Sequence, residues 1–98
     1  MYRGTTPTLN FQLPFEVSQI TKLNIAFSQD NTVVLEKALS DVTREGRKIT
    51  VKLSEMETLS LNDKKGLEIQ LRVAVGSIKM ASPIIKTTVE RILKEGVL

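Results

Sequence analysis

The stretch LEIQLRVAV, residues 67–75, constrains the fold more than any other part of the sequence. Apolar residues occupy every second position along it, which is the period of a β-strand with one buried face. A strand of this length needs hydrogen-bonding partners, and consecutive strands usually pair. The chain is therefore predicted to build a sheet around this segment, with the inward side chains Leu67, Ile69, Leu71, Val73 and Val75.

Three further segments, 8–13, 22–29 and 48–53, alternate in the same way. Their predicted inward side chains are Leu9, Phe11, Leu13, Leu23, Ile25, Phe27, Ile49, Val51 and Leu53. The turn sequence QDN at 29–31 leads into TVVLEKAL, which predicts a hairpin with Val33 and Leu35 facing inward. Other polar turns are expected around Glu45–Gly46, at 62–66 and at Gly76–Ser77.

One short helical turn is predicted near residues 54–59. Ser54 with Glu57 three residues later has the spacing of a capping box, in which each residue bonds the backbone of the other. The alternative is a polar loop in which Met56 and Leu59 serve as apolar plugs.

The segment SPIIKTTVERIL, residues 82–93, is ambiguous between helix and strand. Its apolar spacing suits a helix, and the alternative fold is α+β with a C-terminal helix at 83–95. Its β-branched residues and the unpartnered neighbour strand favour a strand instead. Ser82–Pro83 would then be a kink at the start of an edge strand. In that strand, one face would carry Ile85, Thr87, Val89 and Leu93.

These patterns predict an all-β protein, with residues 1–98 forming a single domain. The spacing of about six to seven strands between polar turns is typical of an antiparallel immunoglobulin-like or fibronectin-III-like β-sandwich. The chain has no cysteine and no tryptophan, so the disulfide and buried tryptophan of antibody domains are absent. The prediction therefore rests on strand number and alternation.

The composition argues against an enzyme. With no histidine and no cysteine, the commonest general base, metal ligands and thiol nucleophile are all missing. The five glycines stand apart, so no phosphate-binding loop is expected, and the acidic residues lie in expected turns. We expect no catalytic residue, no cofactor, no metal and no small-molecule substrate.

The net charge of +3 is spread along the chain, and the aromatic residues are few. Nucleic-acid binding usually needs a concentrated basic face, so none is expected. No run approaches the roughly 18 apolar residues of a membrane span, and the first ten residues lack the apolar core of a signal peptide. We therefore expect no membrane partner.

Protein binding remains as the expected activity. A sandwich has edge strands with free N–H and C=O groups, which can pair with another chain or with a second copy. The termini add three apolar side chains beyond the regular strands, and we predict partner binding by Tyr2, Val97 and Leu98. The alternative is that these residues are frayed ends.

Four stretches carry a resemblance to a known family: MYRGTTPTLNFQLPFEVSQI, VVLEKAL, LSEMETLSL and SPIIKTTVERILKEGVL. Together they resemble a family of small proteins encoded in bacteriophages and in prophages of Gram-positive bacteria, among the structural genes of the tail region. The resemblance implies a non-enzymatic structural or assembly module, such as a tail or baseplate accessory, and supplies no functional residues.

The implied partners are other phage structural proteins and a second copy of the chain. The implied location is the virion, or the host cytoplasm during assembly. Two other functions stay open: a small intracellular regulator that binds a host factor, and a carbohydrate- or surface-binding module. The sugar-binding alternative is weakened by the absence of tryptophan and by the single tyrosine, because sugar sites favour aromatic platforms.

Overall fold

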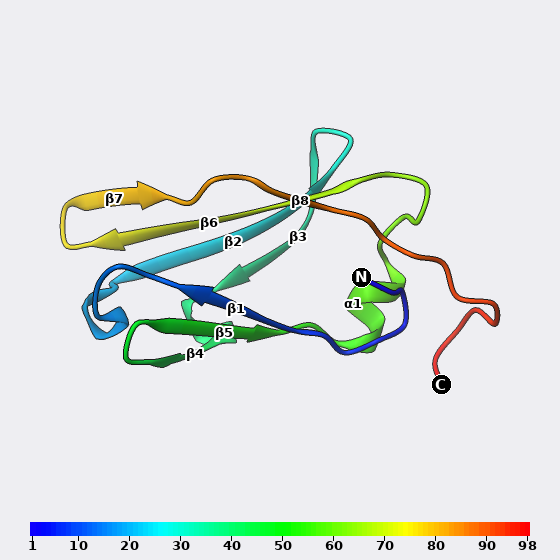
Figure 1. Cartoon of the computed structure of the whole chain (residues 1–98), viewed down its shortest axis with the longest axis horizontal. Helices are drawn as coiled ribbons and strands as arrows, with labels where there is room; N and C mark the ends of the chain where they lie inside the picture. The colour runs from blue at the N-terminus through cyan, green and yellow to red at the C-terminus, as the bar shows by residue number, and fades with distance from the viewer.

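The computed structural model describes residues 1–98 as two antiparallel sheets that enclose one core (Figure 1). The elements in chain order are β1 (Thr8–Gln12), a 3-10 turn η1 (Val17–Gln19), β2 (Lys22–Gln29), β3 (Thr32–Ala38), a 3-10 turn η2 (Leu39–Asp41), β4 (Val42–Glu45), β5 (Lys48–Lys52), α1 (Glu55–Leu59), β6 (Leu67–Val75), β7 (Ile78–Ala81) and β8 (Ile85–Thr87). The predicted β-sandwich is confirmed, and no C-terminal helix forms.

The larger sheet has the order β3-β2-β6-β7, with β8 also paired to β6. The predicted hairpin of β2 and β3 is present, and Asp30 and Asn31 both adopt positive φ angles of 55° and 61°. That geometry belongs to a two-residue turn whose twist matches the strands. Gly76, with φ of 61°, makes the tight turn from β6 to β7.

The smaller sheet has the order β1-β5-β4 and covers the inner face of the larger one. The alternation in the sequence places the core correctly, because burying one face of each strand removes apolar surface from water. Leu9, Leu13 and Val75 are partly buried at its margin. The predicted inward residues that are buried are Phe11, Leu23, Ile25, Phe27, Ile49, Val51, Leu53, Leu67, Ile69, Leu71 and Val73.

The ambiguous segment after β7 is extended. β7 and β8 lie along the same edge of β6 and are separated by an extra residue at the predicted Ser82–Pro83 kink. The Ser82 N–H donates to the Leu71 carbonyl over 2.8 Å, and the Ser82 hydroxyl accepts from the Leu71 N–H over 3.0 Å. The serine side chain thus supplies a ladder bond that the kink would otherwise lose.

Two details of the prediction are wrong. Val33 is 53% exposed, because a bulge between Phe27 and Ser28 shifts the register of β3 and turns Val33 outward. β8 ends at Thr87, so the predicted face, which Ile85 and Thr87 share opposite Ile69 and Leu67, does not continue to Leu93, which is 91% exposed.

The predicted helical turn is confirmed. Ser54 Oγ accepts from the Glu57 N–H over 3.1 Å, and Glu57 Oε1 accepts from the Ser54 N–H over 2.8 Å. Both bonds satisfy backbone donors that the first turn of a helix leaves free. Met56 is 65% exposed, so it does not plug the core.

Candidate functional site: the seam between the two sheets

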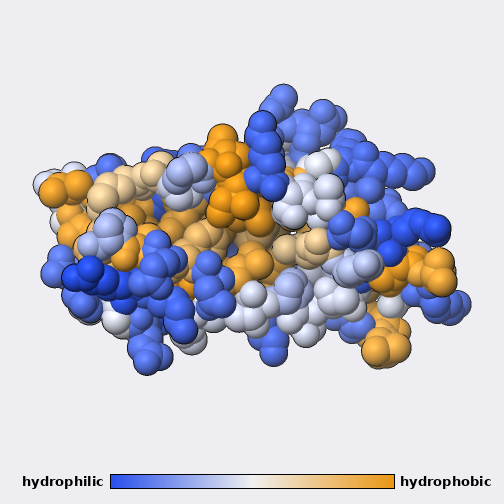
Figure 2. Space-filling view, in the orientation of Figure 1, coloured by the Kyte–Doolittle hydropathy of each residue, from blue (hydrophilic) through white to orange (hydrophobic).

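Along one long side of the sandwich, β1 of the smaller sheet lies near the β7–β8 edge of the larger one, because residues of both line the same two hollows. We call this side the seam. Apolar residues form a band along it, with hydrophilic residues on both sides (Figure 2). The two ends of the seam are built differently, and the difference defines the candidate site.

At the α1 end, the first three residues close the edge just beyond β8. Tyr2 forms a parallel bridge with Glu90, in which the Glu90 N–H donates to the Met1 carbonyl over 2.7 Å and the Arg3 N–H donates to the Glu90 carbonyl over 3.1 Å. The Met1 ammonium donates to Glu90 Oε2 over 2.7 Å. We call residues 1–5 with their partners the latch.

Arg3 fixes the latch to the end of α1. Its Nη2 donates to the Leu59 carbonyl over 2.7 Å, its Nε donates to the Leu61 carbonyl over 2.8 Å, and its Nη1 reaches the Glu95 carboxylate. The carbonyls at a helix C-terminus lack partners within the helix, and a cation there is favourable. One side chain therefore joins the N-terminus, α1 and the C-terminal segment.

Two small residues complete the latch. Gly4 has φ of +70°, and a Cβ there would lie 3.0 Å from Ile92 Cδ1 and 3.3 Å from Leu59 Cδ2. Thr58 is fully buried, and its hydroxyl accepts from the Thr5 N–H over 3.0 Å and donates to the Thr5 carbonyl over 2.8 Å. The latch thus combines polar bonding with close packing.

Two carboxyl groups at this end of the molecule have lowered pKa values. The bond from the Met1 ammonium, helped by the Thr88 hydroxyl, lowers the pKa of Glu90 below its ordinary value. Burial opposes ionisation of Glu57, but the bond from Lys37 and the Ser54 backbone outweigh it and lower the pKa of Glu57. In both cases, ionisation of the carboxyl group stabilises the folded state.

At the opposite end, no terminal segment covers the seam. A hollow of about 280 Å³ opens between the residues after β1 and the inner face of β6 and β7. It is lined mainly by apolar side chains, among them Leu13, Pro14, Phe15, Leu71, Val73 and Met80. A second hollow of about 490 Å³ lies beside the latch and is lined in part by Tyr2 and Ile85.

The β7 strand that borders the open end is exposed at all four residues. Along an antiparallel ladder, residues that exchange backbone hydrogen bonds with the neighbouring strand alternate with residues that do not. Ser82 is of the first kind, because its N–H donates to the Leu71 carbonyl of β6. Met80 and Ile78 are therefore the bonded positions of β7. The N–H and C=O groups of Lys79 and Ala81 face away from β6 and are free to pair with another strand.

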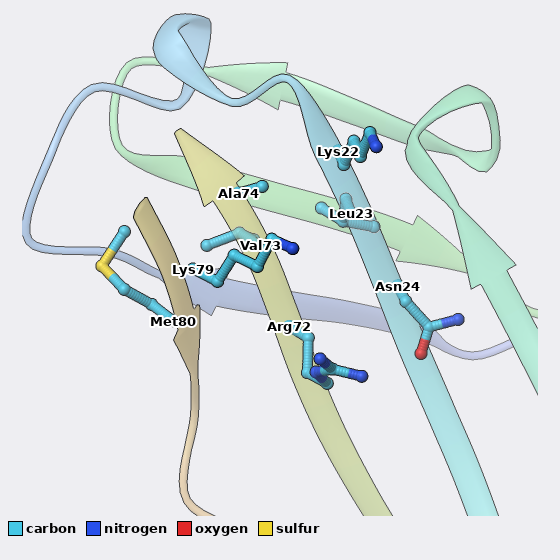
Figure 3. Close-up of a pocket in the computed structure, with 8 residues that line it drawn as sticks. All are labelled: Lys22, Leu23, Asn24, Arg72, Val73, Ala74, Lys79 and Met80. Carbon is cyan, nitrogen blue, oxygen red and sulfur yellow. The ribbon is translucent and has the colours of Figure 1, made fainter. Parts of the chain in front are cut away.

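The two faces of β7 have different chemistry. Met80 lies opposite Val73 and therefore faces the seam, and Ile78 lies opposite Val75 on the same side. Lys79 lies opposite Ala74 on the outer face, in the same row as Lys22 of β2. With Arg72 of β6, these cations border an outer hollow of about 230 Å³ (Figure 3). None of the three forms an ion pair within the chain.

The structure places the three residues predicted from the sequence at the α1 end, where both termini lie (Figure 1). Tyr2 is 59% exposed and lines the hollow beside the latch, while Val97 and Leu98 are exposed at the end of the chain. The Leu98 N–H donates to Glu55 Oε2 over 2.8 Å. No hydrogen bond or ion pair joins Tyr2 to Val97 or Leu98, and their role in partner binding stays a prediction.

The polar groups of the interior have structural roles. Gln29, which is buried, donates to the Asn62 carbonyl over 2.7 Å and accepts from the Asn62 N–H over 2.9 Å, which fixes the loop before β6. No buried side-chain polar atom lacks a partner. No group of three or more His, Cys, Asp or Glu residues is placed to hold a metal ion, and no helix is long and apolar enough to cross a membrane.

Fold and seam together define an immunoglobulin-like β-sandwich, a fold class that is usually not catalytic. The chain is similar in structure to the immunoglobulin-like domain of mouse leukocyte-associated immunoglobulin-like receptor 1, solved as a strand-swapped dimer. The TM-score is 0.50 at 11% identity, over 94% of this chain and 84% of the receptor domain, so the likeness concerns the fold alone. No family model and no curated protein sequence matches the chain.

Sequence reasoning missed the residues of the open end. The signal was available in IKMA, residues 78–81, which continues the alternation after the Gly76–Ser77 reversal. A hairpin extended from that turn would have placed Ile78 and Met80 on one face and Lys79 on the other. The position of Phe15 across the seam, by contrast, depends on how the two sheets stack.

Proposed function

We propose that this protein is a non-enzymatic interaction module that binds an extended segment of a partner protein by adding a strand to the β7 edge. The observation that carries the proposal is the pairing capacity of β7. Its free backbone groups at Lys79 and Ala81 border an apolar hollow that an added strand would cover. Main-chain pairing supplies affinity in such complexes, and alternate side chains supply specificity.

The sandwich protects its edges at β4, at β3 and beyond β8, and leaves the β1 and β7 edges open. Arg44 of β4 donates to the carbonyl of Ile20 over 3.2 Å, which covers that edge with the η1 segment. β3 carries a bulge, a device that discourages edge pairing. The latch occupies the edge beyond β8. β7 has none of these protections.

The resemblance to phage and prophage proteins supports a role in a phage particle or in its assembly. We propose that the module acts in a phage tail or baseplate, or in its assembly, with another phage structural protein as the partner. The proposed location is accordingly the virion, or the host cytoplasm during assembly. Self-association is the alternative mode. The structural neighbour was solved as a strand-swapped dimer, although the likeness to it concerns the fold alone.

The test uses a proline at Ala81. Because the Ala81 N–H faces away from β6, Ala81→Pro removes a donor needed by an added strand and leaves the β6–β7 ladder intact. Thr8→Pro makes the same change on the β1 edge. The Leu53 N–H donates to the Pro7 carbonyl, so the N–H of the next residue, Thr8, faces away from β5, and Thr8 does not line the hollow. We expect Ala81→Pro to abolish, and Thr8→Pro to retain, incorporation into virions or assembly intermediates, measured by mass spectrometry.

Two results would count against the proposal. Absence of the wild-type chain from both virions and assembly intermediates of the encoding phage would remove the phage role. Undiminished incorporation of a folded Ala81→Pro variant would show that β7 pairing is not the mode of binding.

A further inference from the structure

We propose that the β7 edge selects a partner strand in which apolar and acidic side chains alternate. This inference rests on the proposed function, because it assumes strand addition at β7 and identifies the chemistry of the added strand. The selection arises from the contrast between the two faces of β7. The seam face is apolar, whereas the outer face is cationic.

The seam face sets the apolar positions of the partner. A strand added beside β7 places every second side chain on the side of Ile78 and Met80. Those side chains would enter the hollow of about 280 Å³ between Met80 and Phe15. Ile78 is 62% exposed and Met80 is 37% exposed, so covering them removes apolar surface from water.

The outer face sets the acidic positions. The intervening side chains of the added strand lie on the side of Lys79, in the row that also holds Ala74 and Lys22. Arg72 lies in the next row, opposite Ala81. Opposite charges on neighbouring strands attract and like charges repel, so this row favours carboxylates and disfavours cations.

The cationic character is confined to the β7 half of the edge. On the β8 half, Lys86 lies directly opposite Glu68, so the outer face there carries both signs. On the far side of the sheet, Glu36 is engaged by the amide of Asn24 over 3.1 Å. The charge of the outer face therefore marks the same strand that has free backbone groups.

The same charges argue against a second copy as the occupant. If β7 paired with β7 of another molecule, the outer face would bring the Lys79 side chains of both copies onto adjacent strands. That arrangement places like charges on adjacent strands, which is destabilising. A partner with acidic residues on that face has the complementary charge.

The experiment uses three fluorescently labelled peptides of equal length. In each, valine and threonine occupy the seam-facing positions, and the alternate positions are all glutamate, all serine or all lysine. Binding to the full-length protein is measured by fluorescence anisotropy, and amide shifts in NMR spectra locate the site. We expect the glutamate peptide to bind at β7 about tenfold more tightly than the serine peptide, equivalent to about 1.4 kcal/mol, and the lysine peptide to bind more weakly than either.

Two variants and a salt series sharpen the result. Lys79→Glu is expected to reverse the order of the glutamate and lysine peptides, whereas Lys52→Glu, an exposed lysine of β5 in the smaller sheet, is expected to leave it unchanged. If Lys79→Glu does not fold, the wild-type protein still answers the question. Its preference for glutamate should shrink as salt rises from 50 to 500 mM, because salt screens exposed charges.

The outcomes separate this inference from the proposed function. Equal affinity for the three peptides, lost in Ala81→Pro, would overturn the acidic preference and leave strand addition at β7 in place. If none of the three peptides binds, both strand addition at β7 and the acidic preference are overturned for strands with this alternation. Self-association of the wild-type protein in analytical ultracentrifugation, abolished by Ala81→Pro, would identify a second copy as the occupant and overturn the acidic partner.

Discussion

At the two ends of the seam, the gap between the two sheets is treated in opposite ways: one end is closed by residues of the chain, and the other is left open. At the α1 end, Arg3, Gly4 and Thr58 join three segments of the chain through a dense set of bonds and contacts. At the β7 end, an edge with free backbone groups borders an apolar hollow, and no polar side chain closes it. The contrast indicates that the latched end stabilises the fold, while the open end is available for binding.

The largest expected effect is at Arg3. Arg3→Ala removes two charge-assisted bonds to the carbonyls of Leu59 and Leu61 and leaves both acceptors without that partner. We expect a loss of about 2–3 kcal/mol in the free energy of unfolding, measured by urea denaturation. Arg91→Ala, at an exposed arginine of the same C-terminal segment, should change it by less than about 0.5 kcal/mol. Equal effects of the two variants would mean that the latch does not stabilise the fold.

A smaller effect is expected at Gly4, and Gly46 provides a matched control. Both residues have positive φ, but a Cβ at Gly46 would meet nothing within 4 Å, whereas one at Gly4 would press on Ile92 and Leu59. Gly46→Ala should cost about 1 kcal/mol for its backbone conformation, and Gly4→Ala about 1–2 kcal/mol. Thermal unfolding of the two variants measures the difference, and a larger loss at Gly46 would contradict the packing role of Gly4.

Acid should loosen the latched end before the open end. The pKa of Glu90 is lowered in the folded protein, so its contribution is present above the unfolded value of about 4.3 and is lost as the pH falls through the folded value. Hydrogen exchange at Arg3 and Glu90 should therefore accelerate on acidification more than exchange at Met80, once corrected for intrinsic rates. Glu90→Gln should remove most of this pH dependence, and a pH dependence that survives in Glu90→Gln would assign it to another group.

The alternation of side chains predicted the fold because each strand keeps one face buried over its whole length. In LEIQLRVAV that rule leaves no ambiguity. It failed at Val33, because the bulge adds a residue that no local pattern announces. Beyond Thr87 the strand ends. Val89 is still buried beside the latch, as the alternation predicts, but Leu93 is exposed.

The candidate site was less predictable than the fold. The sequence directed attention to the termini, and it is the structure that shows how the N-terminal residues are used: Arg3 bonds a carbonyl 58 positions away, and Met1 bonds a carboxylate 89 positions away. Contacts between residues so far apart in the sequence produce no periodic pattern of residue types. The open end was partly readable, because Ile78 and Lys79 alternate, but the hollow beside them exists only once the sheets are stacked.

The smallest expected effect on stability is at the open end, and it should accompany a large effect on binding. Ile78→Thr keeps a β-branched residue in β7 and changes a side chain that is already 62% exposed. The free energy of unfolding should change by less than about 0.5 kcal/mol, while affinity for the glutamate peptide falls because the threonine covers less apolar surface. Ile84→Thr, at the kink beyond β7, should alter neither quantity appreciably. A stability loss at Ile78 as large as that at Arg3 would mean that the β7 end, like the α1 end, is part of the structural support of the sandwich.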